Sequence, residues 1–302
     1  MRTTFKDEAL HRQMIERGFC SAPLLDAGEV ESLRADMSRI RPALDFGSPE
    51  FTSILYHASF LDPDEAYRRS AYTIVRDALE PKLRELLPDY RPVTGGLLVK
   101  AAGTGQVNLH CDWTSTSDLS DVNIAVWCPL VDVEDGNGAL RVIPGSHKLF
   151  NNIVAARLGG YWTEWEEELK ALSEPVPLKA GEALFFDVSL LHWSRANSSN
   201  ALRPVANLLY IHRQAQPVLY VVNDTFDRLK VYDMEGDALL AHSASDLFKG
   251  NVQAPSLGTI PNPNRKVTLD EVKRRLARRQ GAPEARGWAP QLRQRLARLI
   301  GA

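Results

Sequence analysis

The sequence predicts a mainly β protein with α-helical flanks, built as a sandwich or a jelly-roll barrel. Short β-like segments separated by turn signals fill the middle of the chain, from about residue 96 to residue 212. Helical patterns precede these segments, and two basic helical patterns follow them. Many short strands at such spacing are typical of antiparallel sandwiches and barrels.

Size and composition indicate an ordinary globular protein. The chain has 302 residues, of which 44% are hydrophobic and 25% are charged, so one large domain with appendages is expected. No apolar run is long enough to cross a membrane, and the N-terminus lacks the apolar region of a secretory signal. The three cysteines are an odd number without a C-x-x-C pair, which argues against a disulfide framework. We therefore expect a cytoplasmic location.

The N-terminal part carries clear helix boundaries. Helix-forming residues from Asp7 to Arg17 end at Gly18, a residue that favours the left-handed conformation of a C-cap. Asp26 with Glu29 three residues later has the pattern of a capping box. A second helix is therefore expected to begin after Asp26.

A third helix and a series of strands follow. The helix is expected over about 63–87, with a break near Pro81 because proline has no backbone N–H. Residues 151–175 are expected to be a partly helical insertion between strands. The expected strands are Gly96–Ala101, Val107–Asp112, Asn123–Val131, Ala139–Ile143, Ala183–Asp187, Leu190–Ser194 and Pro204–His212.

The C-terminal part is strongly basic. Residues 264–302 contain 11 Lys and Arg against 3 Asp and Glu. A proline-punctuated linker is expected over Pro255–Pro263, followed by basic helices over Leu269–Gln280 and Pro290–Ile300. We therefore expect a main domain over residues 1–253 and an extension over 254–302. Its helices would pack on the main domain, on a second subunit of a homo-oligomer, or on an anionic carrier protein or membrane. The sequence contains no interleaved aromatic and basic patch of the kind that would indicate nucleic-acid binding.

Two histidines and an aspartate carry the first chemical signal. His110 and Asp112 stand two residues apart at a strand end, so their side chains face the same way while Cys111 points away. Alone this pair is weak, because a strand-end histidine and a turn aspartate also meet by chance. His192 lies in a second apolar strand, either as a third ligand or as a core residue. Two imidazoles and a carboxylate match the facial triad that binds Fe(II) and leaves positions open.

Arg203 is the fourth candidate site residue. It follows His192 by 11 residues, with a strong turn signal at 197–200 between them. If the chain reverses in the middle of this turn, Ser194 stands directly opposite Arg203 in a hairpin. A guanidinium and a hydroxyl would then lie deeper in the barrel than the metal, where a dicarboxylate needs a bidentate partner. The alternative is an ordinary surface arginine.

Four segments together resemble a known family. They are the lead-in Ile15-Glu16-Arg17-Gly18-Phe19, the His110-Cys111-Asp112 motif, the run from Gly138 to Lys148, and His192-Trp193-Ser194 with Asn197, Ser199 and Arg203. On these residues the chain resembles the phytanoyl-CoA dioxygenase family of Fe(II)/2-oxoglutarate oxygenases, over about Phe5 to Ile211.

The resemblance implies a fold, a cofactor and a set of site residues. It implies a double-stranded β-helix core, with Fe(II) on His110, Asp112 and His192. It places 2-oxoglutarate on Arg203 and Ser194, with dioxygen as the second cosubstrate. Two further candidate cosubstrate contacts are Trp127, which could equally be a core tryptophan, and Asn108, which lies two residues before His110.

The implied reaction is oxidation of a C–H bond of a small organic molecule, with release of succinate and carbon dioxide. Hydroxylation is expected, because halogenating relatives lack the carboxylate that Asp112 supplies; desaturation, epoxidation and cyclisation stay open. The substrate is expected to be of the secondary-metabolite kind, free or tethered to a carrier. Alternatives are a cupin-type isomerase or hydrolase, which would not need Arg203, and a non-catalytic binding member, which would not need the triad. The candidate substrate walls are 45–60, 150–165 and 210–213, with Phe51, Tyr56, Tyr161 and Trp162 among their aromatic residues.

Overall fold

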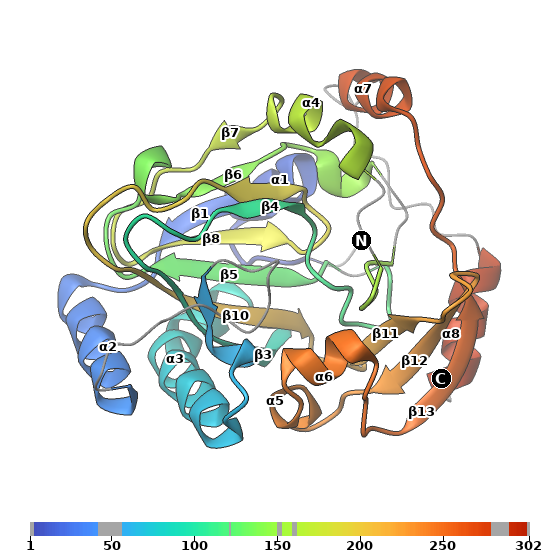
Figure 1. Ribbon diagram of the computed structural model, residues 1–302, viewed down its shortest axis with the longest axis horizontal. Helices are drawn as coiled ribbons and strands as arrows, with labels where there is room; N and C mark the ends of the chain where they lie inside the picture. The colour runs from blue at the N-terminus through green and yellow to red at the C-terminus, as the bar shows by residue number, and fades with distance from the viewer. Residues whose placement is uncertain are drawn as a thin grey trace.

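Two antiparallel sheets face each other at the centre of the structure (Figure 1). The computed structural model describes residues 3–41, 56–120, 122–149, 153–158, 162–278 and 290–300. The larger sheet has the order β1 (Phe19–Pro23), β8 (Glu182–Asp187), β5 (Ile124–Pro129), β10 (Arg203–His212), β3 (Tyr90–Lys100) and β2 (His57–Ala58). The smaller sheet has the order β4 (Val107–His110), β9 (His192–Ser194), β6 (Leu140–Val142) and β7 (Glu174–Pro175). The prediction of a mainly β fold is confirmed.

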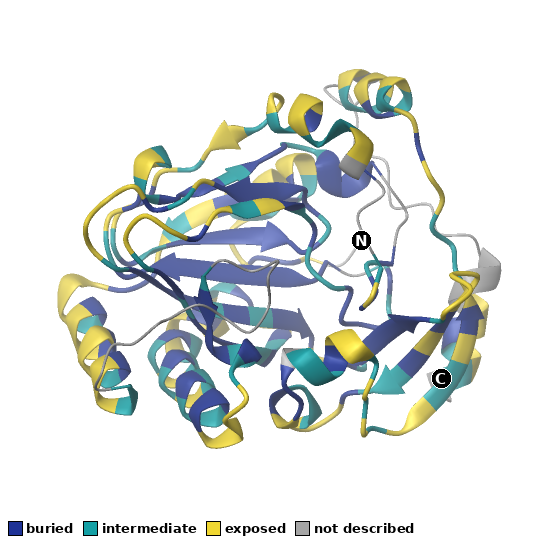
Figure 2. Ribbon diagram, viewed as in Figure 1, coloured by how far each residue is buried: buried dark blue, intermediate teal, exposed yellow. Residues whose placement is uncertain are grey.

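Three helices cover the outer face of the larger sheet: α1 (Glu8–Arg17), α2 (Ala27–Ile40) and α3 (Glu65–Leu86). The predicted caps are confirmed, because Gly18 is left-handed at the end of α1 and Asp26 forms a capping box with Glu29. Figure 2 shows the apolar side of α2 and α3 buried and the opposite side exposed. This arrangement leaves the inner face of the sheet for a site.

The predicted break at Pro81 is wrong, because α3 runs through it without interruption. Proline removes the N–H that would bond the carbonyl of Asp77 four residues earlier. Pro81 and Asp77 are both exposed, so water can take the place of the missing donor. Leu79 and Leu83 on the buried side keep the helix packed against the sheet.

A third sheet was not predicted. It has the order β11 (Val218–Val222), β12 (Arg228–Asp233) and β13 (Ser256–Pro261). The expected linker over 255–263 is therefore wrong, because β13 pairs with β12 along its length. Two short helices, α5 (Ala238–Ala241) and α6 (Ala244–Lys249), connect β12 to β13.

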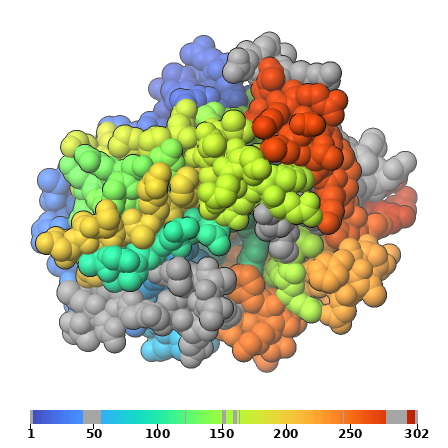
Figure 3. All heavy atoms as spheres, turned by 45° about the horizontal axis from the view of Figure 1, so that its top comes forward, coloured from blue at the N-terminus to red at the C-terminus, as the bar shows by residue number. Residues whose placement is uncertain are grey.

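The basic helices contact the rest of the chain. In α8 (Pro290–Ile300), Leu296 is buried against the third sheet. In α7 (Leu269–Arg278), Val272 is buried against the insertion, where η4 (Thr163–Trp165) leads into α4 (Glu166–Lys170). Figure 3 shows α7 seated beside that yellow-green segment at the surface. The division of the chain after residue 253 stays a prediction.

The remaining described elements are short. They are the 3₁₀ turns η1 (Ser59–Leu61), η2 (Asp135–Asn137) and η3 (Ser146–Lys148). Within the described ranges, no helix is long and apolar enough to span a membrane. Cys20, Cys111 and Cys128 are buried, and none of the three forms a disulfide bond.

Candidate metal centre

A cavity of about 280 Å³ lies between the two central sheets. Its walls come from β3, β5, β8 and β10 on one side and from β4, β6 and β9 on the other. On β10 the alternate residues Arg203, Asn207 and Leu209 face the cavity, while Ala206 and Leu208 pack under the helices. Strand alternation thus gives the larger sheet one apolar face, which packs under the helices, and one face that lines the cavity.

The three predicted metal ligands meet at this cavity. His110 ends β4, His192 begins β9, and the two residues are partners in the sheet. Their ring centroids are 4.1 Å apart. Asp112 Oδ1 lies 3.6 Å from His110 Nε2 and 3.8 Å from His192 Nε2. One ligand atom from each residue falls within 4.8 Å of the others, which is a spacing that one metal ion can bridge.

Both imidazoles present the same nitrogen to the centre. His110 Nδ1 donates to the carbonyl of Asn108, and His192 Nδ1 donates to the carbonyl of Leu190, each at 2.9 Å. A carbonyl only accepts, so Nδ1 carries the proton and Nε2 keeps a free lone pair. Burial, with the neighbouring His110, lowers the pKa of His192 to about 4. The two Nε2 atoms and the Asp112 carboxylate are therefore turned toward one point, where a metal ion can bind.

The strand that carries His110 is held by the insertion. β4 is the edge of the smaller sheet, so the outward backbone groups of Leu109 need partners. Glu166 Oε1 accepts from the Leu109 N–H at 3.0 Å, and Trp162 Nε1 donates to the Leu109 carbonyl at 3.1 Å. Lys170 pairs with Glu166 at 2.9 Å. Sequence analysis missed this support because Glu166 and Leu109 are far apart in the chain.

Arg203 is a buried residue of the cavity wall. Its Nε and Nη1 atoms have no hydrogen-bond partner among the described residues. Its guanidinium carbon lies 5.4 Å from the centre of the Trp127 ring. Burial lowers the pKa of Arg203 to about 10, yet the group remains charged near neutral pH. A buried cation with unused donors fits a carboxylate, so the site passes this test for a dicarboxylate cosubstrate.

Lys100 is a second buried cation that sequence analysis did not identify. It stands directly opposite Arg203 in the register of β3 and β10. Its Nζ donates to Ser194 Oγ at 2.7 Å and to the Arg195 carbonyl at 2.6 Å. Burial, together with the charge of Arg203, lowers the pKa of Lys100 to about 6. The signal in the sequence was a lysine at the end of an apolar strand, which is ordinarily a surface residue.

Two glycines make room for this lysine. Gly105 has a φ of +91°, and a Cβ there would lie 2.7 Å from the Lys100 side chain. Gly138 has a φ of +87°, and a Cβ there would lie 3.0 Å from Lys100 Nζ. Both conformations favour glycine, so these two turns also form the walls around a buried amine.

The predicted hairpin between the strands of His192 and Arg203 is wrong. β9 pairs with β4 and β6, whereas β10 pairs with β3 and β5. The connection crosses from one sheet to the other, as in a jelly roll, so the turn signal at 197–200 does not close a ladder. Ser194 and Arg203 nevertheless both line the cavity, one from each sheet.

The other predicted residues divide into two groups. Trp127 lines the cavity beside Arg203. The Asn108 side chain is exposed and is not brought to the cavity, because the β4–β9 register shifts between Val107 and His110 and breaks the alternation. Only the carbonyl of Asn108 takes part, through His110.

The predicted substrate walls are present in part. Tyr56 and Phe60 line the cavity, whereas Trp162 binds Leu109 and Tyr210 packs in the core under the helices. Residues 42–55, with Phe51, and Tyr161 lie outside the described residues. Walls that were not predicted are Trp113, Leu219, Leu239, His242, Leu247 and Phe248.

Comparison with known families decides the membership of the chain. The phytanoyl-CoA dioxygenase (PhyH) family matches residues 15–205. The chain belongs to the phytanoyl-CoA dioxygenase family. The match includes both histidines, Asp112 and Arg203, and with the triad it identifies a 2-oxoglutarate-dependent non-haem iron enzyme. No protein with a curated description matches the chain.

Solved structures of this PhyH-family fold include two enzymes of nogalamycin biosynthesis. The 2-oxoglutarate-dependent carbocyclase SnoK has 19% identity and a TM-score of 0.50, over 70% of this chain and 86% of SnoK. The epimerase SnoN has 23% identity and a TM-score of 0.48, over 70% of this chain and 84% of SnoN. HygX from Streptomyces hygroscopicus, solved with nickel and 2-oxoglutarate, has 18% identity and a TM-score of 0.47, over 68% of this chain and 86% of HygX. At these identities the likeness to SnoK concerns the fold, a double-stranded β-helix.

Proposed function

We propose that the protein is an Fe(II)/2-oxoglutarate-dependent dioxygenase that hydroxylates a C–H bond of a small organic molecule, releasing succinate and carbon dioxide. One observation carries the proposal: the His110–Asp112–His192 group and a buried guanidinium with unused donors share one cavity. A metal ligand set alone would suit many reactions. The guanidinium adds a place for the far carboxylate of a chelating diacid.

Each residue has a distinct task in this proposal. His110, His192 and Asp112 hold the iron through two Nε2 atoms and one carboxylate. Arg203, Lys100 and Ser194 bind the far carboxylate of 2-oxoglutarate, and Trp127 packs beside it. When bound, iron with 2-oxoglutarate and dioxygen supplies the oxidising chemistry. The protein supplies orientation and a dry wall, to which Leu140 and Phe186 contribute.

The proposal differs from its alternatives in its use of Arg203. A cupin-type isomerase or hydrolase has no use for a buried dicarboxylate anchor, and a binding protein has no use for a complete triad. A carrier-tethered substrate and a homo-oligomer through α7 and α8 stay proposals without a supporting contact.

The test is anaerobic titration of the Fe(II)-loaded protein with 2-oxoglutarate, followed by the visible charge-transfer absorption of the chelate. We expect a saturable band. Arg203→Met should raise the required concentration about a hundredfold, because it removes one partner of a buried charge pair. Arg195→Met is the matched control, since its side chain is exposed and pairs with Asp135 at the surface. Absence of the band, or a band unchanged in Arg203→Met, would contradict the proposal.

A further inference from the structure

The cavity has a charged end and an apolar end. Arg203 and Asn207 are four residues apart on β10, which is about 13 Å along a strand. The span between the two backbones exceeds the length of a five-carbon diacid held between Arg203 and the metal centre, so we take Asn207, the sheet partner of Trp127, to lie beyond the cosubstrate. The wall around this outer part is made by Phe60, Leu98, Trp113, Leu209, Leu219, Leu239, Leu247 and Phe248.

In the described part of the chain, the outer part of the cavity has no charged group to offer a substrate. Among the described residues that line the cavity, the ionisable groups other than the Tyr56 phenol and the Cys111 thiol are Lys100, Arg203, Asp112 and three histidines. Lys100 and Arg203 are assigned to the diacid, and Asp112, His110 and His192 are assigned to the metal. His242 is the remaining group. His242 Nδ1 donates to the Ala238 carbonyl at 2.8 Å, and its Nε2 accepts from the Gln253 N–H at 2.8 Å. Both of its ring nitrogens are therefore used within the protein.

The Asn207 amide faces the outer part of the cavity without a hydrogen-bond partner among the described residues. Asn207 lies on the inner face of β10, beside Gly96 and Trp127 in the sheet. No hydrogen bond joins its amide to any side chain or backbone group in the described part of the chain. An amide both donates and accepts, so it suits a carbonyl or a hydroxyl of a ligand. Thr94 lines the cavity from β3 and adds a hydroxyl nearby.

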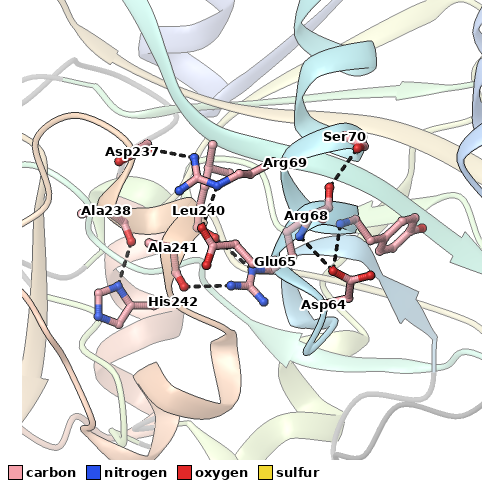
Figure 4. Close-up of polar contacts among 12 residues, drawn as sticks. Asp64, Glu65, Arg68, Arg69, Ser70, Asp237, Ala238, Leu240, Ala241 and His242 are labelled. Atoms are coloured by element: carbon pink, nitrogen blue, oxygen red, sulfur yellow. Dashed lines mark hydrogen bonds and ion pairs between the residues drawn. The ribbon is translucent and has the colours of Figure 1, made fainter.

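The apolar wall is held in place from behind. The Arg68 guanidinium donates to the carbonyls of Leu240 at 3.0 Å and Ala241 at 2.8 Å (Figure 4). It also donates to the carbonyls of Asp62 and Pro63. Arg69 adds an ion pair to Asp237. These contacts join α3 to α5, so the wall made by Leu239 is formed before a ligand arrives.

We infer that the primary substrate is an uncharged, mostly apolar ring compound whose carbonyl or hydroxyl group hydrogen-bonds Asn207. The inference rests on the proposed function, since the diacid is taken to occupy the charged end. Aromatic walls favour flat rings, and a charged ligand would be buried without a partner. An apolar ligand with no polar group would instead leave the Asn207 amide unsatisfied.

The experiment compares four probes of one shape: indane, 1-indanone, 2-aminoindane and indane-2-carboxylate. Calorimetry measures their binding to protein loaded with Ni(II) and 2-oxoglutarate, which fills the charged end. We expect 1-indanone to bind about tenfold tighter than indane and than either charged probe. A tenfold difference in affinity is what one hydrogen bond to a buried polar group contributes. Asn207→Leu should abolish the preference for 1-indanone over indane.

Two further variants keep the result decisive. Asn207→Asp has the same shape and adds a negative charge, so it should gain about tenfold in affinity for 2-aminoindane. Asn200→Leu changes an exposed asparagine outside the cavity and should leave all four affinities as they are. Binding of the carboxylate as tight as that of 1-indanone, or no binding of 1-indanone, would overturn the inference. The affinity for 2-oxoglutarate is measured first, and its absence would instead refute the proposed function.

Discussion

Lys100 and Arg203 are paired residues of adjacent strands, and both side chains point into the cavity between the sheets. Two neighbouring cations repel each other unless an anion lies between them. Burial and the charge of Arg203 lower the pKa of Lys100 to about 6, so the lysine is mostly neutral above neutral pH. The pair is thus prepared for a carboxylate that restores the proton to the amine.

This relationship predicts proton uptake when 2-oxoglutarate binds. At pH 8 the free protein holds Lys100 neutral, and a bound carboxylate raises its pKa by favouring the charged form. The affinity should therefore fall as pH rises above about 6. Calorimetry in buffers of different ionisation enthalpy measures the uptake, and Lys100→Met should remove both the uptake and the slope. An affinity independent of pH between 6 and 9 in the native protein would refute this role.

The insertion is predicted to set metal affinity through Leu109. Glu166→Ala removes the acceptor of the Leu109 N–H and should weaken Ni(II) binding about tenfold, as loss of supporting hydrogen bonds does. Glu166→Gln keeps the acceptor and should restore most of the affinity. Glu167→Ala is the control, because Glu167 is exposed and pairs with the same Lys170. In a His110→Ala background, Glu166→Ala should cause no further loss of Ni(II) affinity. A loss of affinity as large as in the native background would mean that the effect of Glu166→Ala is a general structural one.

Arg68 is predicted to be the most costly arginine of α3 to remove. Arg68→Met keeps the apolar stem but leaves the carbonyl of the buried Leu240, and that of Ala241, without this donor, which should cost about 3 kcal/mol of unfolding free energy. Urea denaturation measures the change in midpoint. Arg76→Met on the same helix changes an exposed pair with Asp77 and should cost less than about 0.5 kcal/mol. Similar losses in both variants would show that the carbonyl contacts do not matter.

Metal binding is predicted to stabilise the fold. At a hundred times its dissociation constant, an ion that binds only the folded state adds about 2.7 kcal/mol. Thermal unfolding with and without anaerobic Fe(II) measures this gain as a rise in Tm. Asp112→Ala should remove the rise and also abolish substrate-dependent succinate release. Asp118→Ala, which changes a carboxylate in the loop that follows, should keep both; an equal Tm rise in Asp112→Ala would exclude Asp112 as a ligand.

The sequence was sufficient to predict that the three candidate ligands meet, because strand period and residue chemistry are local. Because His110 and Asp112 are two residues apart, their side chains point toward the same place. Arg203 faces the cavity by the same alternation on its own strand. The Asn108 side chain does not reach the cavity, and the reason is also local. The register shift in β4 rotates it outward, and no turn signal in the sequence marks that shift.

Lys100 and the α5–α6 wall could not be predicted because they depend on contacts between distant segments. A lysine after Leu97, Leu98 and Val99 is expected at a surface, and only the closeness of Gly105 and Gly138 encloses it. The third sheet was within reach, since Val218–Val222 is an uninterrupted apolar run typical of a buried strand. The crossing from β9 to β10 was not, because a turn signal does not say which sheet the next strand joins.

The closure of β4 by Trp162 and Glu166 has a consequence beyond the metal. An unpaired strand edge is a template on which another polypeptide can add a strand, and that is a common start of aggregation. Here an indole N–H and a carboxylate occupy the backbone groups of Leu109 that such an intruder would use. The same two side chains that steady a ligand strand therefore also protect the molecule against self-association during its lifetime.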